Sequence, residues 1–332
     1  MRPPISGVLG GQAARTFPPP IAAVAPLTVA GVPAARREGG TRSRLPAALM
    51  LLRPRQWVKN VFVLAVPLAV APAALLRHLD LALATVVTFV AASAAVYVLN
   101  DWLDREKDRL HPVKRHRPLA SGQVGPAGAL LLGAGCLAAL AGGASLLPLP
   151  VVAAVAGYLV LNLAYCLRLK HYPLVDVSVV AVGFLLRAVA GCLAVAAPFN
   201  PALIICVYCT CLLMSLGKRR HELATADLRG QATAHRPALS GYSVPLLDQL
   251  TAVLLAATLI SYVLFVLSGP DPNAAVLAVV TVPFAIFALC RYAHLLASQG
   301  GGGEPGRDVF ADAPLVINAV LWLGCLAVGP LL

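Results

Sequence analysis

Several long stretches of this chain contain no charged residue at all. Residues 81–99, 124–167 and 249–270 contain no Asp, Glu, Lys or Arg. A helix needs about 20 apolar residues to cross the hydrocarbon of a bilayer. A water-soluble core could not bury a chain that is 59% hydrophobic and only 12% charged, so we infer that a bilayer is its solvent.

These runs predict nine spanning helices. The run 124–167 is too long for one crossing, and turn residues at Gly142-Gly143 and Pro148-Leu149-Pro150 favour a hairpin within it. The expected spans are 61–76, 81–99, two within 124–167, 174–196, a sixth within 188–217, and then 249–270, 272–290 and 313–332. The predicted fold class is therefore all-α, as a polytopic membrane bundle.

Lys and Arg gather in alternate connections, and this sets the expected orientation. With the N-terminus inside, the inner segments hold 24 of the 26 Lys and Arg residues. Of the other two, Arg77 lies in the first outer loop and Arg187 lies within a span. Because cytoplasmic loops retain positive charge, we predict a plasma-membrane protein with its N-terminus and basic loops in the cytoplasm and its C-terminus outside.

The net charge of +12 has two readings. It is either the ordinary excess of positive inner loops or an attraction to anionic lipid or a phosphate-rich substrate. No basic stripe is interleaved with base-stacking aromatic residues, which argues against a nucleic-acid partner.

The N-terminal segment differs from the rest of the chain. Residues 1–45 are rich in Pro, Gly, Ala and Arg without a sustained period, which predicts a disordered cytoplasmic arm. Residues 46–332 form one membrane domain. All eight cysteines lie in apolar runs and are expected to be small buried hydrophobes. Cys206, Cys209 and Cys211 lack the accompanying ligands that a metal site would need.

A stripe of aspartates at the end of the second predicted span is the strongest chemical signal. Asp101, Asp104 and Asp108 are spaced to share one helix face, with His111 one turn further on. Binding a hard cation would relieve their repulsion, and Mg²⁺ accepts one or two carboxylates together with water and substrate phosphate oxygens. The alternative is a solvated charged helix end in which neighbouring Lys and Arg residues pair with the aspartates.

Cations follow this stripe and recur in other inner loops. Lys114 and Arg117 belong to a compact basic loop directly after the aspartates. A metal beside cations is typical of a diphosphate site, because both neutralise a phosphorylated leaving group. Lys59, Lys170 and Lys218 belong to further basic clusters on the same side, although each cluster alone could be a positive-inside anchor.

Arg187 interrupts an otherwise uncharged span. An intramembrane arginine that faces lipid is costly, so this side chain is expected to point into the bundle. Its expected partner is either Asp176, eleven residues earlier on nearly the same helix face, or a bound phosphate. Glu222 follows Lys218 by four residues and is expected to pair with it.

These motifs resemble the UbiA superfamily of membrane transferases, whose members have nine helices, basic loops on one side and an Asn-Asp-x-x-Asp-x-x-x-Asp motif at the end of the second helix. The likeness covers residues 46–332 and is greatest to the branch of bacterial decaprenyl-phosphate phosphoribosyltransferases. It is carried by Arg53-Pro-Arg-Gln-Trp-Val-Lys-Asn60, Asn100 to Pro118, Leu169-Lys170 through Asp176, Phe184-Leu-Leu-Arg187 and Gly217-Lys-Arg-Arg-His-Glu222. Prenyl-diphosphate-using members carry a second aspartate-rich motif after the sixth helix, and this chain has Lys and Arg there.

The resemblance implies Mg²⁺-dependent transfer of 5-phosphoribose from phosphoribosyl diphosphate to a polyprenyl (decaprenyl) phosphate at the bilayer, toward cell-wall arabinan precursors. By the same resemblance, Asp101, Asp104 and Asp108 are catalytic, and Asn100, Asp101 and Asp104 bind the metal. The implied substrate-binding residues are Lys59, Tyr97, Lys114 and Arg117 for the donor, Lys170 and Arg187 for the acceptor phosphate, and Lys218 for further phosphate charge. The oligomeric state is left open, and a homo-oligomer is compatible with the sequence.

Two alternative functions remain at this point. One is a prenyltransferase that moves an isoprenoid from its diphosphate to an aromatic or lipid acceptor. The other is a transporter or lipid-binding membrane protein without catalytic activity. Transporters tend to carry ionisable groups at mid-membrane, whereas the predicted spans carry almost none apart from Arg187.

Overall fold

The structure is a computed structural model that describes residues 46–111, 114–228, 237–269, 272–298 and 305–328. These residues belong to one compact unit, Leu45–Leu332. The arm predicted for residues 1–45 lies outside the described residues.

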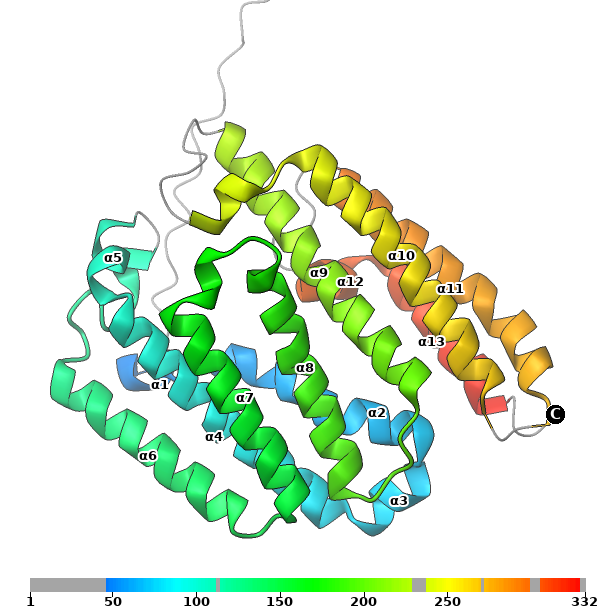
Figure 1. The fold of residues 1–332 in the computed structure, drawn as a ribbon, viewed down its shortest axis with the longest axis horizontal. Coiled ribbons are helices and arrows are strands. Elements are labelled where there is room, and N and C mark those ends of the chain that lie inside the picture. Colours follow the sequence, from blue (N-terminus) through cyan, green and yellow to red (C-terminus); the bar gives the residue numbers. More distant parts are fainter. Residues whose placement is uncertain (1–45, 112–113, 229–236, 270–271, 299–304, 329–332) are drawn as a thin grey trace, which may run out of the picture. The chain divides into compact units, whose positions relative to one another are not determined.

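Helices are the regular elements of the described part (Figure 1). The first half of the unit contains α1 (Ala47–Leu51), η1 (Pro54–Val61), α2 (Phe62–Val70), α3 (Pro72–Arg77), α4 (Leu79–Leu103), α5 (Arg105–Leu110), η2 (Lys114–His116), α6 (Pro126–Ala144) and α7 (Leu149–Leu167). The second half contains η3 (Leu169–His171), α8 (Val175–Ala194), α9 (Pro201–Leu228), η4 (Pro237–Gly241), α10 (Val244–Leu267), α11 (Ala274–Ala297), α12 (Pro305–Ala311) and α13 (Ala313–Val328). Elements written η are 3₁₀-helices.

Seven of the described helices are long and apolar enough to cross a membrane, namely α4 and α6 to α11. The protein is therefore a multi-pass membrane protein, as predicted. The first expected span consists instead of two short helices, α2 and α3, which separate at Ala71 (φ −152°, ψ 59°). The proline at position 72 explains this break, because the residue before a proline is disfavoured in helical conformation. The last expected span corresponds to the 16-residue α13, and the total of nine spans stays a prediction.

The helix α8 lies at the centre of the packing. It contacts α2, α7, α9 and α4, and together with α4 it is the most buried of the spans. Gly191 permits the close approach of α2, because a Cβ atom at this position would overlap the backbone oxygen of Val63. Small residues at such crossings are how membrane helices pack tightly. By contrast, α6 is almost entirely at the periphery of the unit.

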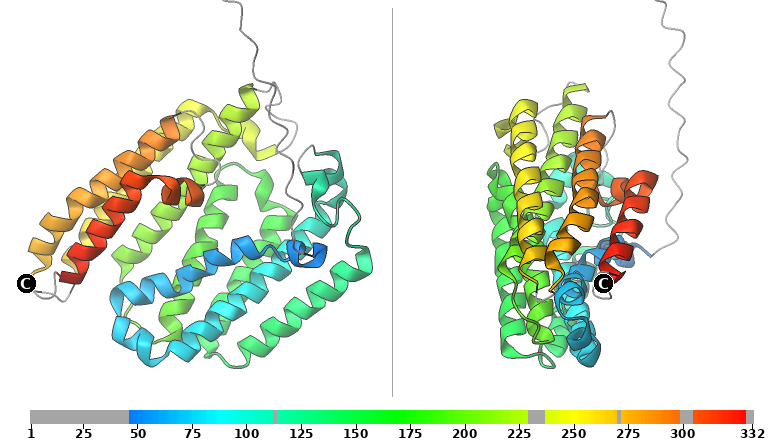
Figure 2. Two further views of the ribbon diagram at one scale, coloured as in Figure 1. Left: turned by 180° about the vertical axis from the view of Figure 1, so that it is seen from behind. Right: turned by 90° about the vertical axis from the view of Figure 1, so that its right-hand side faces the viewer.

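The short elements gather at one end of the bundle. Figure 1 shows α5, η2, η3 and η4 near the C-terminal ends of α4, α7 and α9, and Figure 2 shows the same arrangement from behind. Residue contacts join α5 to η2 and η3 to η4. Of the basic segments expected on one side of the membrane, η1, α5, η2 and η3 contribute side chains to the site described next.

Candidate functional site

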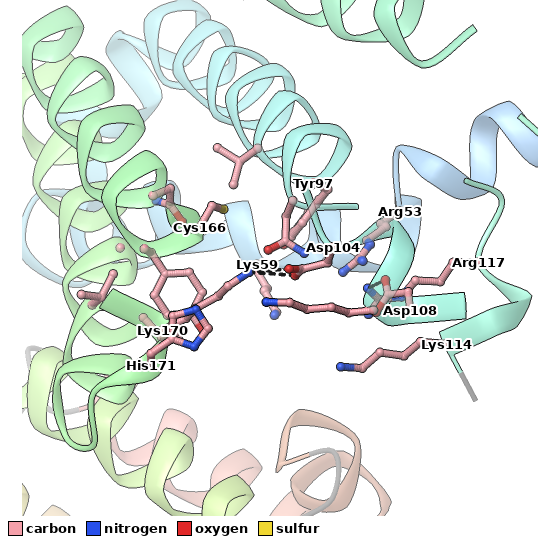
Figure 3. A pocket seen from close by; sticks show the side chains of 18 of the residues that line it. Arg53, Lys59, Tyr97, Asp104, Asp108, Lys114, Arg117, Cys166, Lys170 and His171 are labelled. Carbon is pink, nitrogen blue, oxygen red and sulfur yellow. Dashed lines mark hydrogen bonds and ion pairs between the residues drawn. The ribbon is translucent and has the colours of Figure 1, made fainter. Parts of the chain in front are cut away.

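A cavity of about 680 Å³ opens at this end of the bundle, between α4, α7 and α8 (Figure 3). Its charged lining comprises seven Lys and Arg residues and two carboxylates: Arg53, Lys59, Lys107, Lys114, Arg117, Lys170 and Arg187 against Asp104 and Asp108. Polar uncharged groups on its walls include Tyr97 and Asn100 of α4 and Tyr158 and Asn162 of α7. The cavity is thus strongly cationic, and it reaches from polar loops to the buried faces of the spans.

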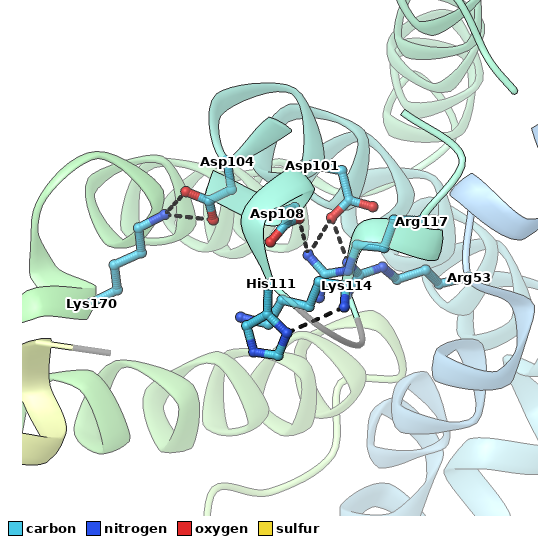
Figure 4. Close-up of polar contacts among 8 residues, drawn as sticks. All are labelled: Arg53, Asp101, Asp104, Asp108, His111, Lys114, Arg117 and Lys170. Carbon is cyan, nitrogen blue, oxygen red and sulfur yellow. Dashed lines mark hydrogen bonds and ion pairs between the residues drawn. The ribbon is translucent and has the colours of Figure 1, made fainter. Parts of the chain in front are cut away.

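One wall is organised by two arginines that hold two buried aspartates (Figure 4). The Nη1 atom of Arg117 donates to Asp101 Oδ1 at 3.1 Å and to Asp108 Oδ2 at 2.7 Å. Arg53 donates to the same Asp101 oxygen and stacks over the Tyr97 ring at 5.0 Å. Asp101 is only 3% exposed and is absent from the cavity lining, so it lies behind the wall and fixes both guanidinium groups.

The third aspartate turns the other way. Asp104 is a single non-helical residue (φ −92°, ψ 1°) between α4 and α5. Its carboxylate accepts from Lys170 Nζ at 2.7 and 2.8 Å, on the side away from Asp101 and Asp108 (Figure 4). Lys170 comes from η3, so this pair joins two elements that are far apart in sequence.

The three aspartates therefore do not share one continuous helix face as expected, because the chain leaves the helical conformation at Asp104 and Asp108 belongs to α5. Among the described residues, no three acidic, His or Cys side chains converge to hold a metal. Around the end of α4 and in α5, the carboxylate and amide side chains that line the cavity are Asn100, Asp104 and Asp108, each four residues after the previous one. Of the expected metal set, Asn100 and Asp104 reach the cavity, whereas Asp101 does not.

Arg187 lies at the buried base of the cavity, which confirms that it points into the bundle. Its guanidinium donates to Asn60 Oδ1 and Gly183 O, both at 2.8 Å, and to the Tyr158 hydroxyl at 3.0 Å. It also lies 4.4 Å from the centre of the Tyr158 ring. The predicted pairing with Asp176 is wrong, because eleven helical residues separate the two by about 16 Å along the axis although they share a face.

Lys59 enters the cavity from η1. Lys59 as a residue is exposed, but the protein atoms packed around its amine disfavour the charged form, and the nearby charges of Lys218, Arg187 and Arg53 add repulsion, so the pKa of Lys59 falls to about 8. Lys218 is exposed and does not line the cavity, although its charge reaches Lys59.

Arg219 and Arg220, which follow Lys218, form ion pairs. Buried Arg219 donates to Asp176 Oδ2 at 2.8 Å and also pairs with Glu222. Arg220 donates to Asp248 Oδ1 at 2.6 Å. The expected partner of Glu222 was Lys218, but Arg219 takes this place, because its guanidinium can reach two carboxylates at once.

The model of the UbiA prenyltransferase family matches residues 60–301. The chain belongs to this family. A decaprenyl-phosphate phosphoribosyltransferase of Corynebacterium glutamicum is 36% identical over 84% of this chain and 85% of its own length. The enzyme of the same name from Mycolicibacterium smegmatis is 34% identical over 87% of this chain and 93% of its own length.

Solved structures of UbiA proteins share the fold. A UbiA homologue from Archaeoglobus fulgidus bound to DMAPP and Mg²⁺ superposes with a TM-score of 0.64 at 20% identity, covering 86% of this chain and all of that one. The same homologue bound to GPP and Mg²⁺ gives the same score. At this identity the likeness concerns the UbiA fold of this chain, and the ligands are those of the archaeal protein.

Most of the site residues predicted from this sequence line the same cavity. Those that line it are Lys59, Tyr97, Asn100, Asp104, Asp108, Lys114, Arg117, Lys170 and Arg187, whereas Asp101 and Lys218 lie outside the lining. Tyr158, Asn162 and Tyr165 of α7 also line it and were not predicted from the sequence. Their spacing of four and three residues places them on one face of an otherwise apolar span, and this pattern is the signal that could have found them.

Proposed function

We propose that this family member is a membrane phosphoribosyltransferase that transfers 5-phosphoribose from phosphoribosyl diphosphate to a polyprenyl phosphate and releases diphosphate. The charge of the cavity carries the proposal, because seven Lys and Arg side chains face two carboxylates there. Such an excess of cations fits ligands rich in phosphate. Support also comes from the relatives named decaprenyl-phosphate phosphoribosyltransferase, at 34% and 36% identity over most of the chain.

The donor lies, in this proposal, against the wall that carries η1 and η2. Arg117 is fixed by Asp101 and Asp108, so its guanidinium is already oriented before a ligand arrives. Lys114 and Lys59 line the same cavity. Their ammonium groups add positive charge for the diphosphate and the 5-phosphate without imposing a fixed hydrogen-bond geometry. The Tyr97 hydroxyl supplies a hydrogen bond beside them.

The oxygen donors of α4 and α5 fit a hard divalent cation such as Mg²⁺. Asn100, Asp104 and Asp108 all face the cavity, and one or two carboxylates are enough when substrate phosphate oxygens complete the shell. Bound Mg²⁺ would neutralise charge on the departing diphosphate. Asp101 has a different proposed role from the one expected, because it orients Arg53 and Arg117 from behind the wall.

The acceptor phosphate is assigned to the deeper part of the cavity. Arg187 and Lys170 lie on the membrane side and the loop side of this region, and both line the cavity. The bond from the sugar C1 to the diphosphate oxygen breaks, and an oxygen of the acceptor phosphate forms the new bond. That phosphate is already ionised at pH 7, so the reaction requires no strong general base.

Orientation belongs to the same proposal. The distribution of Lys and Arg favours a cytoplasmic cavity, where a soluble phosphorylated sugar is accessible, and an outer C-terminus. The prenyl chain of the acceptor would remain among apolar helix faces in the bilayer. A product of this kind would feed the synthesis of cell-wall arabinan.

An assay with isotopically labelled phosphoribosyl diphosphate tests the proposal. Membranes containing the protein are incubated with the labelled donor, decaprenyl phosphate and Mg²⁺, and lipid products are separated. The expected result is a labelled phosphoribosyl lipid whose formation needs the acceptor and stops with EDTA. A prenyltransferase would instead use a labelled prenyl diphosphate, and a transporter would make neither product, so either outcome would overturn the proposal.

A further inference from the structure

The connection between α7 and α8 contains a strained turn. Leu174 has φ 63° and ψ −41°, and the amide of Val175 donates to Pro173 O at 2.8 Å. These values define a γ-turn with a positive φ at its centre, a conformation that is rare for any residue with a side chain. The Leu174 side chain is 46% exposed, so its own packing does not account for the turn.

Two residues at the end of η4 hold this turn from outside. The Tyr242 hydroxyl accepts from the Leu174 amide at 2.6 Å and donates to Asp176 Oδ1 at 2.7 Å. Gly241 lies against the ring of Pro173, because a Cβ atom there would come within 2.3 Å of Pro173 Cγ. Strained backbone persists only where its surroundings over-determine it, and these two contacts, on Pro173 and on the Leu174 amide, supply such surroundings.

The Asp176 carboxylate is itself fixed. It is fully buried, and its second oxygen accepts from Arg219 Nε of α9 at 2.8 Å. Tyr242 is therefore held in place by Asp176 and Arg219 and cannot move with the turn if the turn relaxes. The turn begins two residues after η3, the short element that carries Lys170 toward Asp104.

We propose that Tyr242 and Gly241 are positioning residues that set the place of Lys170 in the cavity through the γ-turn at Leu174. Neither residue lines the cavity, so their effect passes through the backbone of residues 170–174. The functional part of this inference rests on the proposed phosphoribosyl transfer, in which Lys170 contacts the acceptor phosphate. Its geometric part concerns only the Lys170–Asp104 pair.

A double-mutant cycle tests the functional part in full-length protein. Tyr242→Phe keeps the ring and removes the hydroxyl, and we expect phosphoribosyl transfer to fall about 10- to 100-fold, as a displaced active-site group can cause. In a Lys170→Met background, the same substitution should change the remaining transfer by less than about twofold. A merely structural hydroxyl would lower the two activities by the same factor, and that result would overturn the proposal.

Matched controls exist elsewhere in the chain. Tyr262 is buried to a similar degree, its hydroxyl accepts from Trp322 Nε1 at 2.7 Å, and neither residue lines the cavity. Tyr262→Phe should leave transfer unchanged. Gly241→Ala should reproduce the loss seen with Tyr242→Phe, whereas Gly157→Ala, where a new Cβ would meet nothing within 4 Å, should not.

A second measurement does not depend on activity. The Lys170 side chain is 14% exposed and pairs with Asp104, so an amine-reactive ester should modify it slowly, as read by mass spectrometry. Tyr242→Phe should make this modification several-fold faster, and Tyr262→Phe should not. Equal rates in all three proteins would overturn the geometric part. If the wild-type protein made no phosphoribosyl lipid, the proposed function would be wrong. The rates of Lys170 modification would still test the geometric part of this inference.

Discussion

Replacing Arg117 tests whether its guanidinium holds the two buried aspartates, Asp101 and Asp108, beside the cavity. Asp101 and Asp108, only 3% and 4% exposed, both depend on its Nη1 atom. In Arg117→Met, Asp101 retains Arg53, whereas Asp108 loses the ion-pair partner that the described residues provide. Removing one partner of a buried pair costs about 3–5 kcal/mol. Because Arg117 itself is 28% exposed and water can enter the space it leaves, we expect the free energy of unfolding to fall by the lower limit of this range, about 3 kcal/mol.

Thermal unfolding of the detergent-solubilised protein measures this loss, and Arg109→Met is the matched control. Arg109 pairs with Glu106 on the surface of the same segment, at 47% and 66% exposure. Solvent screens such a pair, and the other bond of Arg109, from Nε to Ala120 O, is long at 3.3 Å, so Arg109→Met should lower the unfolding midpoint much less than Arg117→Met does. Arg117→Met should lower the midpoint by several degrees and should also weaken donor binding.

A second substitution separates the buried charge from other causes of instability. Asp108→Asn in the Arg117→Met background removes the unpaired carboxylate, so most of the lost stability should return. Donor binding should remain weak, because the guanidinium is still missing. If Arg117→Met unfolded at the wild-type temperature, or if Asp108→Asn gave no recovery, the structural role assigned to Arg117 would be refuted.

Three further predictions concern the reaction. Asp104→Asn is nearly isosteric and should lower Mg²⁺-dependent transfer about 100- to 1,000-fold with little loss of stability; unchanged turnover would remove this residue from the site. Arg187→Gln should raise KM for the polyprenyl phosphate about 10- to 100-fold and leave KM for the donor unchanged, which initial rates at varied acceptor would reveal. Because the pKa of Lys59 is about 8, its charge is present below pH 8 and is lost above it, so kcat/KM for the donor should fall about tenfold per pH unit above pH 8. Lys59→Arg stays charged and should flatten this profile, whereas an unchanged profile would contradict the role of Lys59.

The main features of the fold could be predicted because they follow from solvation. Uncharged runs had to be spans, and the distribution of Lys and Arg placed the basic loops at one end of the bundle, where the structure has them. Arg187 was correctly expected to face inward, since lipid exposure of a charge is costly. The break between α2 and α3 was also visible in principle as a proline at position 72.

The contacts within the site could not be predicted in the same way. Asp101, Asp104 and Asp108 were expected to act together, yet Asp104 pairs with Lys170, 66 residues away in sequence, and leaves the other two to Arg117. Such pairings depend on how α4, α7 and α8 pack, and helical spacing alone carries no information about it. The error over Asp176 and Arg187 has a simpler origin, because angular position on a helix was considered without the axial rise.

The unequal charge of the cavity also favours phosphoribosyl transfer over the prenyl alternative. Arg53 and Arg117 are bound to Asp101, and Lys170 is bound to Asp104, so these cations are compensated within the protein. For Lys59 the electrostatic neighbours that shift its pKa are all cations, and their repulsion has a cost that a bound anion would relieve. A prenyl diphosphate brings a single charged group, which a bound metal and the cations beside it could neutralise. Phosphoribosyl diphosphate with a lipid phosphate brings two more, and these additional phosphates account for cations that extend as far as the buried base of the cavity.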